Sequence, residues 1–114
     1  MSKNLKELQD LLLQGQKLSM QGSLDRRMPD KKSIPFLIDA RKGLKEYVIL
    51  NPEDSIAWRL LSQAEESLLN YPEALTSLAK SIEFGGKDKK DLKRIALLKE
   101  CISSWNELEL TLNN

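Results

Sequence analysis

The chain has 114 residues, of which 40% are hydrophobic and 31% are charged, and its formal net charge is +1. This length and composition are typical of one folded domain, 1–114, with a single modest core, rather than of a disordered chain. The near-neutral balance excludes a strong whole-molecule attraction to nucleic acid or to a membrane, and no apolar run is long enough to span a bilayer. We therefore expect a cytoplasmic protein that does not bind membranes.

The first half of the chain predicts two helices separated by a loop. Residues 3–21 are rich in good helix formers, and their leucines recur on one helical face until Gly22 ends the pattern. Residues 23–34 lack apolar periodicity and combine charged residues with a proline, which is typical of a loop. Pro35 then suits the first turn of a second helix, and that helix cannot continue through Pro52.

The next segment predicts a helical hairpin. Asp54 or Ser55 is a suitable N-cap for a helix that runs to about Leu69. The Asn-Tyr-Pro sequence at 70–72 predicts a tight turn, followed by a helix with a proline in its first turn. Gly85, which a second glycine follows, ends this helix. No sustained alternation of apolar and polar residues predicts a strand, so we expect an all-α fold.

The last segment, 89–112, has two interpretations. Its apolar residues recur at helical spacing and no glycine or proline interrupts them, which is compatible with one long helix. The internal repeat of the chain instead predicts a turn near Ser103 and Ser104, because Trp105 corresponds to Tyr71 at the earlier turn. We favour the turn, and one continuous helix is the alternative.

The chain repeats its own apolar pattern at a spacing of 34 residues, without a gap, across most of residues 35–114. Ala40 and Leu44, for example, recur as Ala74 and Leu78. A fixed period of this size indicates an array of small supersecondary units that stack on one another. Such a stack has a long exposed surface, and surfaces of this kind usually bind other proteins.

Residues 55–88 resemble a tetratricopeptide repeat. This family places small residues where the two helices of a hairpin cross closely, and Ser62 and Ala74 stand at those positions here. Three positions depart from the family pattern: Glu65 replaces a usual aromatic residue, Leu69 a usual glycine and Gly86 a usual proline. The residues that match the pattern are Trp58, Leu61, Ser62, Tyr71, Ala74, Leu78 and Ser81.

The resemblance implies an all-α, right-handed superhelical stack of about three helix-turn-helix hairpins. Repeat 1 spans about 8–54 with a 13-residue insertion near 23–35, repeat 2 spans 55–88, and a partial repeat 3 spans 89–114. Gly15 takes the small-residue position of repeat 1. For function, the resemblance implies a non-enzymatic adaptor or scaffold that binds a partner peptide or protein in its concave groove.

In this family the first helices of successive hairpins line the groove. Arg59, Lys93 and Arg94 would then bring like charges together, while Asp91 would face another side of its helix. This pattern favours a partner with acidic character, and the apolar groove residues would supply affinity. The predicted groove consists of Ile56, Arg59, Leu60, Gln63, Ser67, Lys90, Lys93, Arg94 and Leu97.

Enzymatic activity has little support in the sequence. The chain contains no histidine, which is the commonest general base and a common metal ligand. Its one cysteine, Cys101, has no histidine to activate it, and no phosphate-binding glycine loop or metal-ligand spacing is present. We expect no catalytic residue, no metal and no cofactor.

Two other functions remain as alternatives. The basic clusters at 26–32 and 87–94 would suit a weak nucleic-acid or acidic-surface binder, but aspartates dilute both of them. We interpret these clusters as solvated and helix-capping residues, and nucleic acid is not the expected partner. The second alternative is a structural, self-assembling module. Leu108, Leu110 and Leu112 form an apolar end without a polar cap, which predicts weak homo-oligomerisation.

Overall fold

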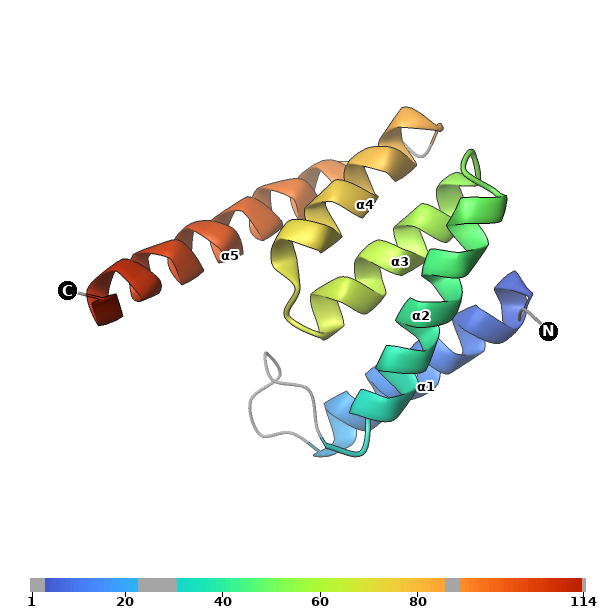
Figure 1. The fold of residues 1–114 in the computed structure, drawn as a ribbon, viewed down its shortest axis with the longest axis horizontal. Helices are drawn as coiled ribbons and strands as arrows, with labels where there is room; N and C mark the ends of the chain where they lie inside the picture. The colour runs from blue at the N-terminus through green and yellow to red at the C-terminus, as the bar shows by residue number, and fades with distance from the viewer. Residues whose placement is uncertain (1–3, 23–30, 86–88, 114) are drawn as a thin grey trace.

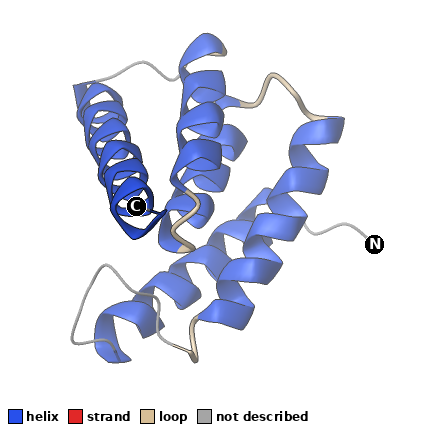
Figure 2. Cartoon of the chain, turned by 60° about the vertical axis from the view of Figure 1, so that its left-hand side comes forward, coloured by secondary structure: helices blue, strands red, loops and turns tan. Residues whose placement is uncertain are grey.

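A computed structural model describes residues 4–22, 31–85 and 89–113, which form five α-helices (Figure 1). These ranges contain no strand (Figure 2), and the prediction of an all-α fold is confirmed. The helices are α1 Leu5–Gly22, α2 Ile34–Leu50, α3 Ser55–Ser67, α4 Tyr71–Glu83 and α5 Lys89–Asn113.

The helices pack against one another in chain order. Each helix contacts the next one, and α1 also contacts α3 (Figure 1). The resulting shape is elongated, 46 × 32 × 25 Å, with α5 along one edge. The described residues form two apolar clusters in the interior: a larger one between α1, α2 and α3, and a smaller one between α4 and α5.

Capping and proline signals set several helix boundaries. Asp54 is the N-cap of α3, because its Oδ1 accepts hydrogen bonds from the backbone N–H of Ile56 at 3.1 Å and of Ala57 at 3.2 Å. Pro35 and Pro72 lie in the first turns of α2 and α4, where a missing N–H interrupts no intrahelical hydrogen bond. The predicted roles of these residues are confirmed.

Two connections use a backbone conformation with positive φ. Gly85, at φ 115°, follows the end of α4 as predicted, and glycine adopts this conformation without steric cost. Leu69 lies in the turn between α3 and α4 at φ 65°, which brings the Cβ of an L-residue too close to the backbone. The position at which the resembled family usually has glycine therefore has a glycine-like backbone but a leucine side chain.

Small residues lie where the helices approach most closely. Ser62 and Ala74 are fully buried, and the Ser62 hydroxyl donates to the Ala74 carbonyl at 2.7 Å, which confirms the predicted crossing of α3 and α4. Gly15 lies at the corresponding crossing of α1 and α2, where a Cβ would stand 2.8 Å from Leu37 Cδ2. Gly43 of α2 faces α1, where an added Cβ would require the end of the flexible Leu8 side chain to shift.

Helix α5 shows that the predicted turn near Ser103 is wrong. The helix continues through all its 25 residues, so the end of the chain is one helix rather than a hairpin. The reason is local, because residues 89–112 contain no glycine or proline to break the helix. Since α4 has only 13 residues, α5 extends beyond its neighbour (Figure 1).

Some sequence predictions fall outside the described residues. Most of the predicted insertion lies in residues 23–30, for which no structure is described. The side chains of Leu108, Leu110 and Leu112, which carry the prediction of self-association, are likewise outside the description.

Candidate functional site

The predicted groove residues differ in their exposure. Ile56 on α3 and Lys93 and Leu97 on α5 are exposed, as a binding surface requires. Gln63 and Ser67 are half-buried. These five residues remain candidates for contact with a partner.

Leu60 does not belong to a groove. Its side chain is buried in the larger apolar cluster, together with Ala57 and Ala64. These three residues recur at helical spacing, so they share the face of α3 that packs against α1 and α2. The side chain of Lys90 lies outside the described residues.

The two arginines of the predicted groove are paired with carboxylates of this chain. Arg59 Nη2 donates to Asp91 Oδ2 at 2.8 Å, and Arg94 Nη2 donates to Glu66 Oε2 at 2.7 Å. The expectation that Asp91 faces another side of α5 is wrong, because its side chain is only 3% exposed. Asp91 and Arg94 are three residues apart and share a helical face directed at α3. These pairs remove the reason for expecting an acidic partner at the two arginines.

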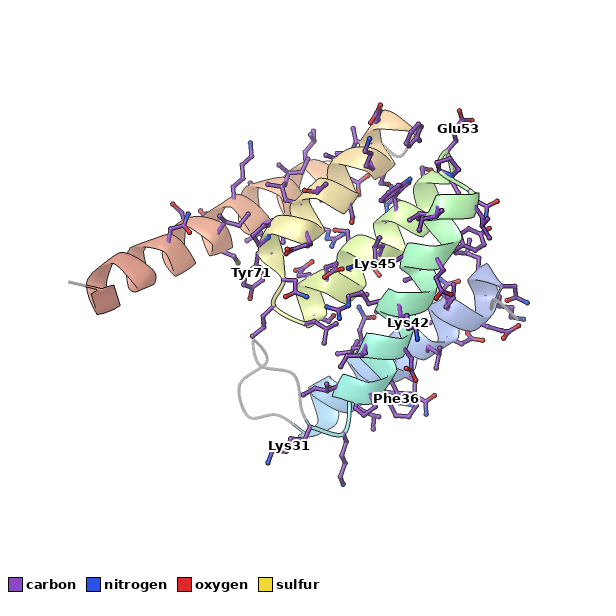
Figure 3. All side chains as sticks on the ribbon, viewed as in Figure 1. Lys31, Phe36, Lys42, Lys45, Glu53 and Tyr71 are labelled. Carbon is purple, nitrogen blue, oxygen red and sulfur yellow. The ribbon has the colours of Figure 1, made fainter. Side chains whose placement is uncertain are left out.

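A cleft opens on the opposite side of α3, between α2 and α4, with a volume of about 450 Å³. Trp58, Leu61 and Glu65 of α3 line it at helical spacing, so they share one face of the helix. Lys45 extends into it from α2 towards α3 (Figure 3). The lining residues are Lys45, Val48 and Ile49 from α2, Trp58, Leu61 and Glu65 from α3, and Pro72, Glu73, Thr76 and Ser77 from α4.

The walls of the cleft are mainly apolar. Val48 and Leu61 are buried, and Trp58 is half-buried with its indole N–H donating to the Pro52 carbonyl at 2.8 Å. This hydrogen bond fixes the position of the ring. Ile49 is 76% exposed where it borders the cleft. Covering apolar surface that is in contact with water lowers the free energy, so binding of a partner over this surface is favoured.

Glu65 brings a buried carboxylate into this apolar setting, since the residue is 1% exposed. Its Oε2 accepts a hydrogen bond from Asn70 Nδ2 at 2.9 Å and lies 3.9 Å from Arg41 Nη1. Its Oε1 lies 3.7 Å from Lys45 Nζ and accepts no hydrogen bond from any described residue. A buried carboxylate oxygen without a donor costs free energy, so this oxygen favours a ligand that supplies one.

Ser77 adds a second polar group to the cleft. The residue is 5% exposed, and its hydroxyl makes no hydrogen bond within the part of the chain that the structure describes. The hydroxyls of two other buried serines, Ser62 and Ser81, donate to backbone carbonyls at 2.7 Å and 2.8 Å. Unlike these two hydroxyls, the Ser77 hydroxyl is therefore available for a hydrogen bond with water or a ligand.

Sequence reasoning did not find the cleft. Its walls come from three helices, and which residues meet there depends on how the helices cross rather than on a local pattern. One signal was present, because Glu65 is a charged residue at a position where the resembled family usually has an aromatic side chain. This departure marks the polar floor of the cleft.

Within the described ranges, no group of three histidine, cysteine, aspartate or glutamate side chains is placed to hold a metal ion. Cys101 is half-buried and free. In the same ranges, no helix is long and apolar enough to cross a membrane. The absence of enzymatic activity and of a cofactor stays a prediction.

The comparisons with known proteins return no match: no protein-family model, curated protein or solved structure is similar to this chain. The resemblance to tetratricopeptide repeats therefore rests on the residues of the sequence. Function has to be argued from the site itself.

Proposed function

We propose that this chain is a non-enzymatic protein-interaction module that works as an adaptor or scaffold in the cytoplasm. The observation that carries the proposal is the open cleft between α2, α3 and α4, with apolar walls and an isoleucine, Ile49, that is 76% exposed beside it. A concave, mainly apolar site with a few polar groups is the usual form of a binding site. A segment of a partner protein would cover this surface.

A stack of tetratricopeptide-like hairpins with a right-handed superhelical arrangement is part of the same proposal. The contacts of each helix with the next support it. So do the close crossings at Ser62 and Ala74 and at Gly15, which match the small-residue positions of the family pattern. Helical arrays of this type commonly bind partner proteins.

The cleft is favoured over the predicted groove on α3 and α5. Arg59 and Arg94 are already neutralised by carboxylates of the chain, and Leu60 is buried. The groove keeps Ile56, Lys93 and Leu97 as exposed contacts, so it remains the competing site.

Site-specific photo-crosslinking in the cells that express the chain distinguishes the two surfaces. A photoreactive amino acid replaces Ile49 beside the cleft, Ile56 in the predicted groove, or Leu50 as a matched control. Leu50 is the neighbour of Ile49 and is 72% exposed, but it does not line the cleft. We expect a crosslinked protein from position 49 and not from 50 or 56. Crosslinks from position 56 alone would move the site to the groove, and crosslinks from none would contradict the proposal.

Self-association is a second candidate function, which the length of α5 favours. This helix has 25 residues against the 13 of α4, so its distal part lies beyond the helix it packs on (Figure 1). Another copy of the chain would pack against that part. Sedimentation velocity over a range of concentrations tests this candidate, and a strict monomer at the highest concentration would exclude it.

A further inference from the structure

The cleft combines a large apolar volume with two deep polar groups, and this combination specifies the chemistry of its ligand. A cavity of about 150 Å³ is sufficient to bind benzene. The volume of this cleft, about 450 Å³, accommodates an aromatic side chain with the backbone that carries it. Val48, Trp58 and Leu61 supply apolar contacts for such a ring.

A purely apolar side chain would fit this cleft poorly. It would leave Glu65 Oε1 without a hydrogen-bond donor and would cut the Ser77 hydroxyl off from water. Desolvating polar groups without replacing their hydrogen bonds weakens binding. The ligand therefore needs an apolar body with a hydrogen-bond donor at its tip.

The charges around Glu65 favour a neutral donor over a cationic one. Arg41 Nη1 and Lys45 Nζ already lie 3.9 Å and 3.7 Å from its carboxylate oxygens. A third cation would be repelled by both of them. A neutral N–H or O–H avoids this repulsion. Lys45, whose side chain is 55% exposed, has room to shift aside when the donor takes its place beside Oε1, and its charge stays close enough to repel a cation.

We infer that the cleft holds a tryptophan or tyrosine side chain of the partner protein, with its ring between Val48, Trp58 and Leu61. The indole N–H or phenol O–H donates to Glu65 Oε1, and the Ser77 hydroxyl donates to a backbone carbonyl of the segment that carries the ring. The inference rests on the proposed function and names the anchor that the partner supplies. Tryptophan and tyrosine are well suited to this role, because each joins a large apolar surface to one donor.

Titration of the full, isotope-labelled chain by NMR tests the inference with small probes. The probes are the N-acetyl amides of tryptophan, tyrosine, phenylalanine and arginine. We expect the first two to shift the backbone amide signals of residues that line the cleft. The phenylalanine probe lacks the donor and should bind about tenfold more weakly, as the loss of a hydrogen bond to a charged group implies. The arginine probe should be excluded by Arg41 and Lys45.

Two variants distinguish specific binding in the cleft from non-specific binding to apolar surface. Ser77→Ala removes the hydroxyl with open hydrogen-bonding capacity and should weaken the binding of the tryptophan and phenylalanine probes by the same factor, because both probes have the backbone carbonyl to which it donates. Thr76→Ala is the matched control, because Thr76 lines the same cleft but its hydroxyl donates to the Pro72 carbonyl at 3.1 Å. This variant should keep the wild-type affinity of both probes.

The outcomes also separate this inference from the proposed function. Equal binding of the tryptophan and phenylalanine probes, tightest binding of the arginine probe, or unchanged affinities of both aromatic probes in Ser77→Ala would each overturn the inference. Crosslinking of a protein from position 49 would still support the proposed function in those cases. Without a crosslink from position 49 or position 56, the proposed function itself would fail.

Discussion

The two ion pairs between α3 and α5 have similar lengths but different burial, which predicts different costs of breaking them. Arg59→Met removes the guanidinium 2.8 Å from Asp91, whose side chain is 3% exposed. Arg94→Met removes the guanidinium 2.7 Å from Glu66, whose side chain is 42% exposed. Breaking a buried pair costs about 3–5 kcal/mol, whereas a broken exposed pair costs about 0–1 kcal/mol because the carboxylate returns to water. Asp91 takes part in further interactions, which still stabilise its charge when Arg59 is replaced. We therefore expect Arg59→Met to lower the unfolding free energy by about 3 kcal/mol, the lower end of the range for a buried pair.

Urea unfolding followed by far-UV circular dichroism measures both effects. Arg59→Met should lose about 3 kcal/mol, a large part of the roughly 5–15 kcal/mol that stabilises a typical domain, with an unchanged denaturant slope. Arg94→Met should lose less than about 1 kcal/mol. A double variant, Arg59→Met with Asp91→Leu, should recover most of the loss, because it leaves no buried charge. Equal losses in the two single variants would refute the reasoning from burial.

Three further outcomes follow from local features of the fold. Ala74→Leu should overpack the crossing of α3 and α4 and lower the unfolding free energy by about 1–3 kcal/mol; an unchanged melting temperature would contradict this packing. Leu69→Gly should keep or raise the melting temperature, because glycine relieves the positive φ, whereas Leu68→Gly, which removes a side chain packed on the core, should lower it. Burial raises the pKa of the Tyr47 phenol, and the charge and hydrogen bond of Asp54 raise it further. Because this pKa is higher in the folded than in the unfolded state, the stabilisation is complete below about pH 10 and is lost as the pH rises beyond it. Melting temperatures in alkaline buffers should therefore fall more steeply for the wild type than for Tyr47→Phe, and parallel curves would count against this.

The sequence predicted the helices well because the signals that begin and end helices act within one turn. Asp54, Pro72 and Gly85 stand at the predicted boundaries, and each acts through its own backbone or the nearest N–H groups. Ser62 and Ala74 were predictable for a related reason, since a close crossing admits only small residues. The turn at Ser103 failed because it was inferred from the repeat alone, against the uninterrupted helical sequence around it.

The candidate site was less predictable, because it depends on which helices meet. The partner of Asp91 lies on α3, and the spacing of residues along α5 does not reveal it. The cleft likewise joins Ile49, Glu65 and Ser77 from three helices, and its position follows from the angles at which the helices cross. In the sequence, only Glu65 indicated the cleft, because it is a charged residue at a position where the resembled family usually has an aromatic side chain.

The glycines of this chain differ in how strongly their surroundings restrict amino-acid substitution during evolution. At Gly15 an added methyl group would meet Leu37 Cδ2 and Cγ at 2.8 and 2.9 Å and its backbone nitrogen at 3.3 Å, so substitution there separates the helices, whereas at Gly43 it would clash only with the end of the flexible Leu8 side chain, which can shift. At Gly85 a Cβ would meet nothing within 4 Å, and the backbone conformation alone restricts the choice of residue, because φ 115° strains any residue with a side chain. A distant relative should therefore keep Gly15 even where its exposed residues have all changed.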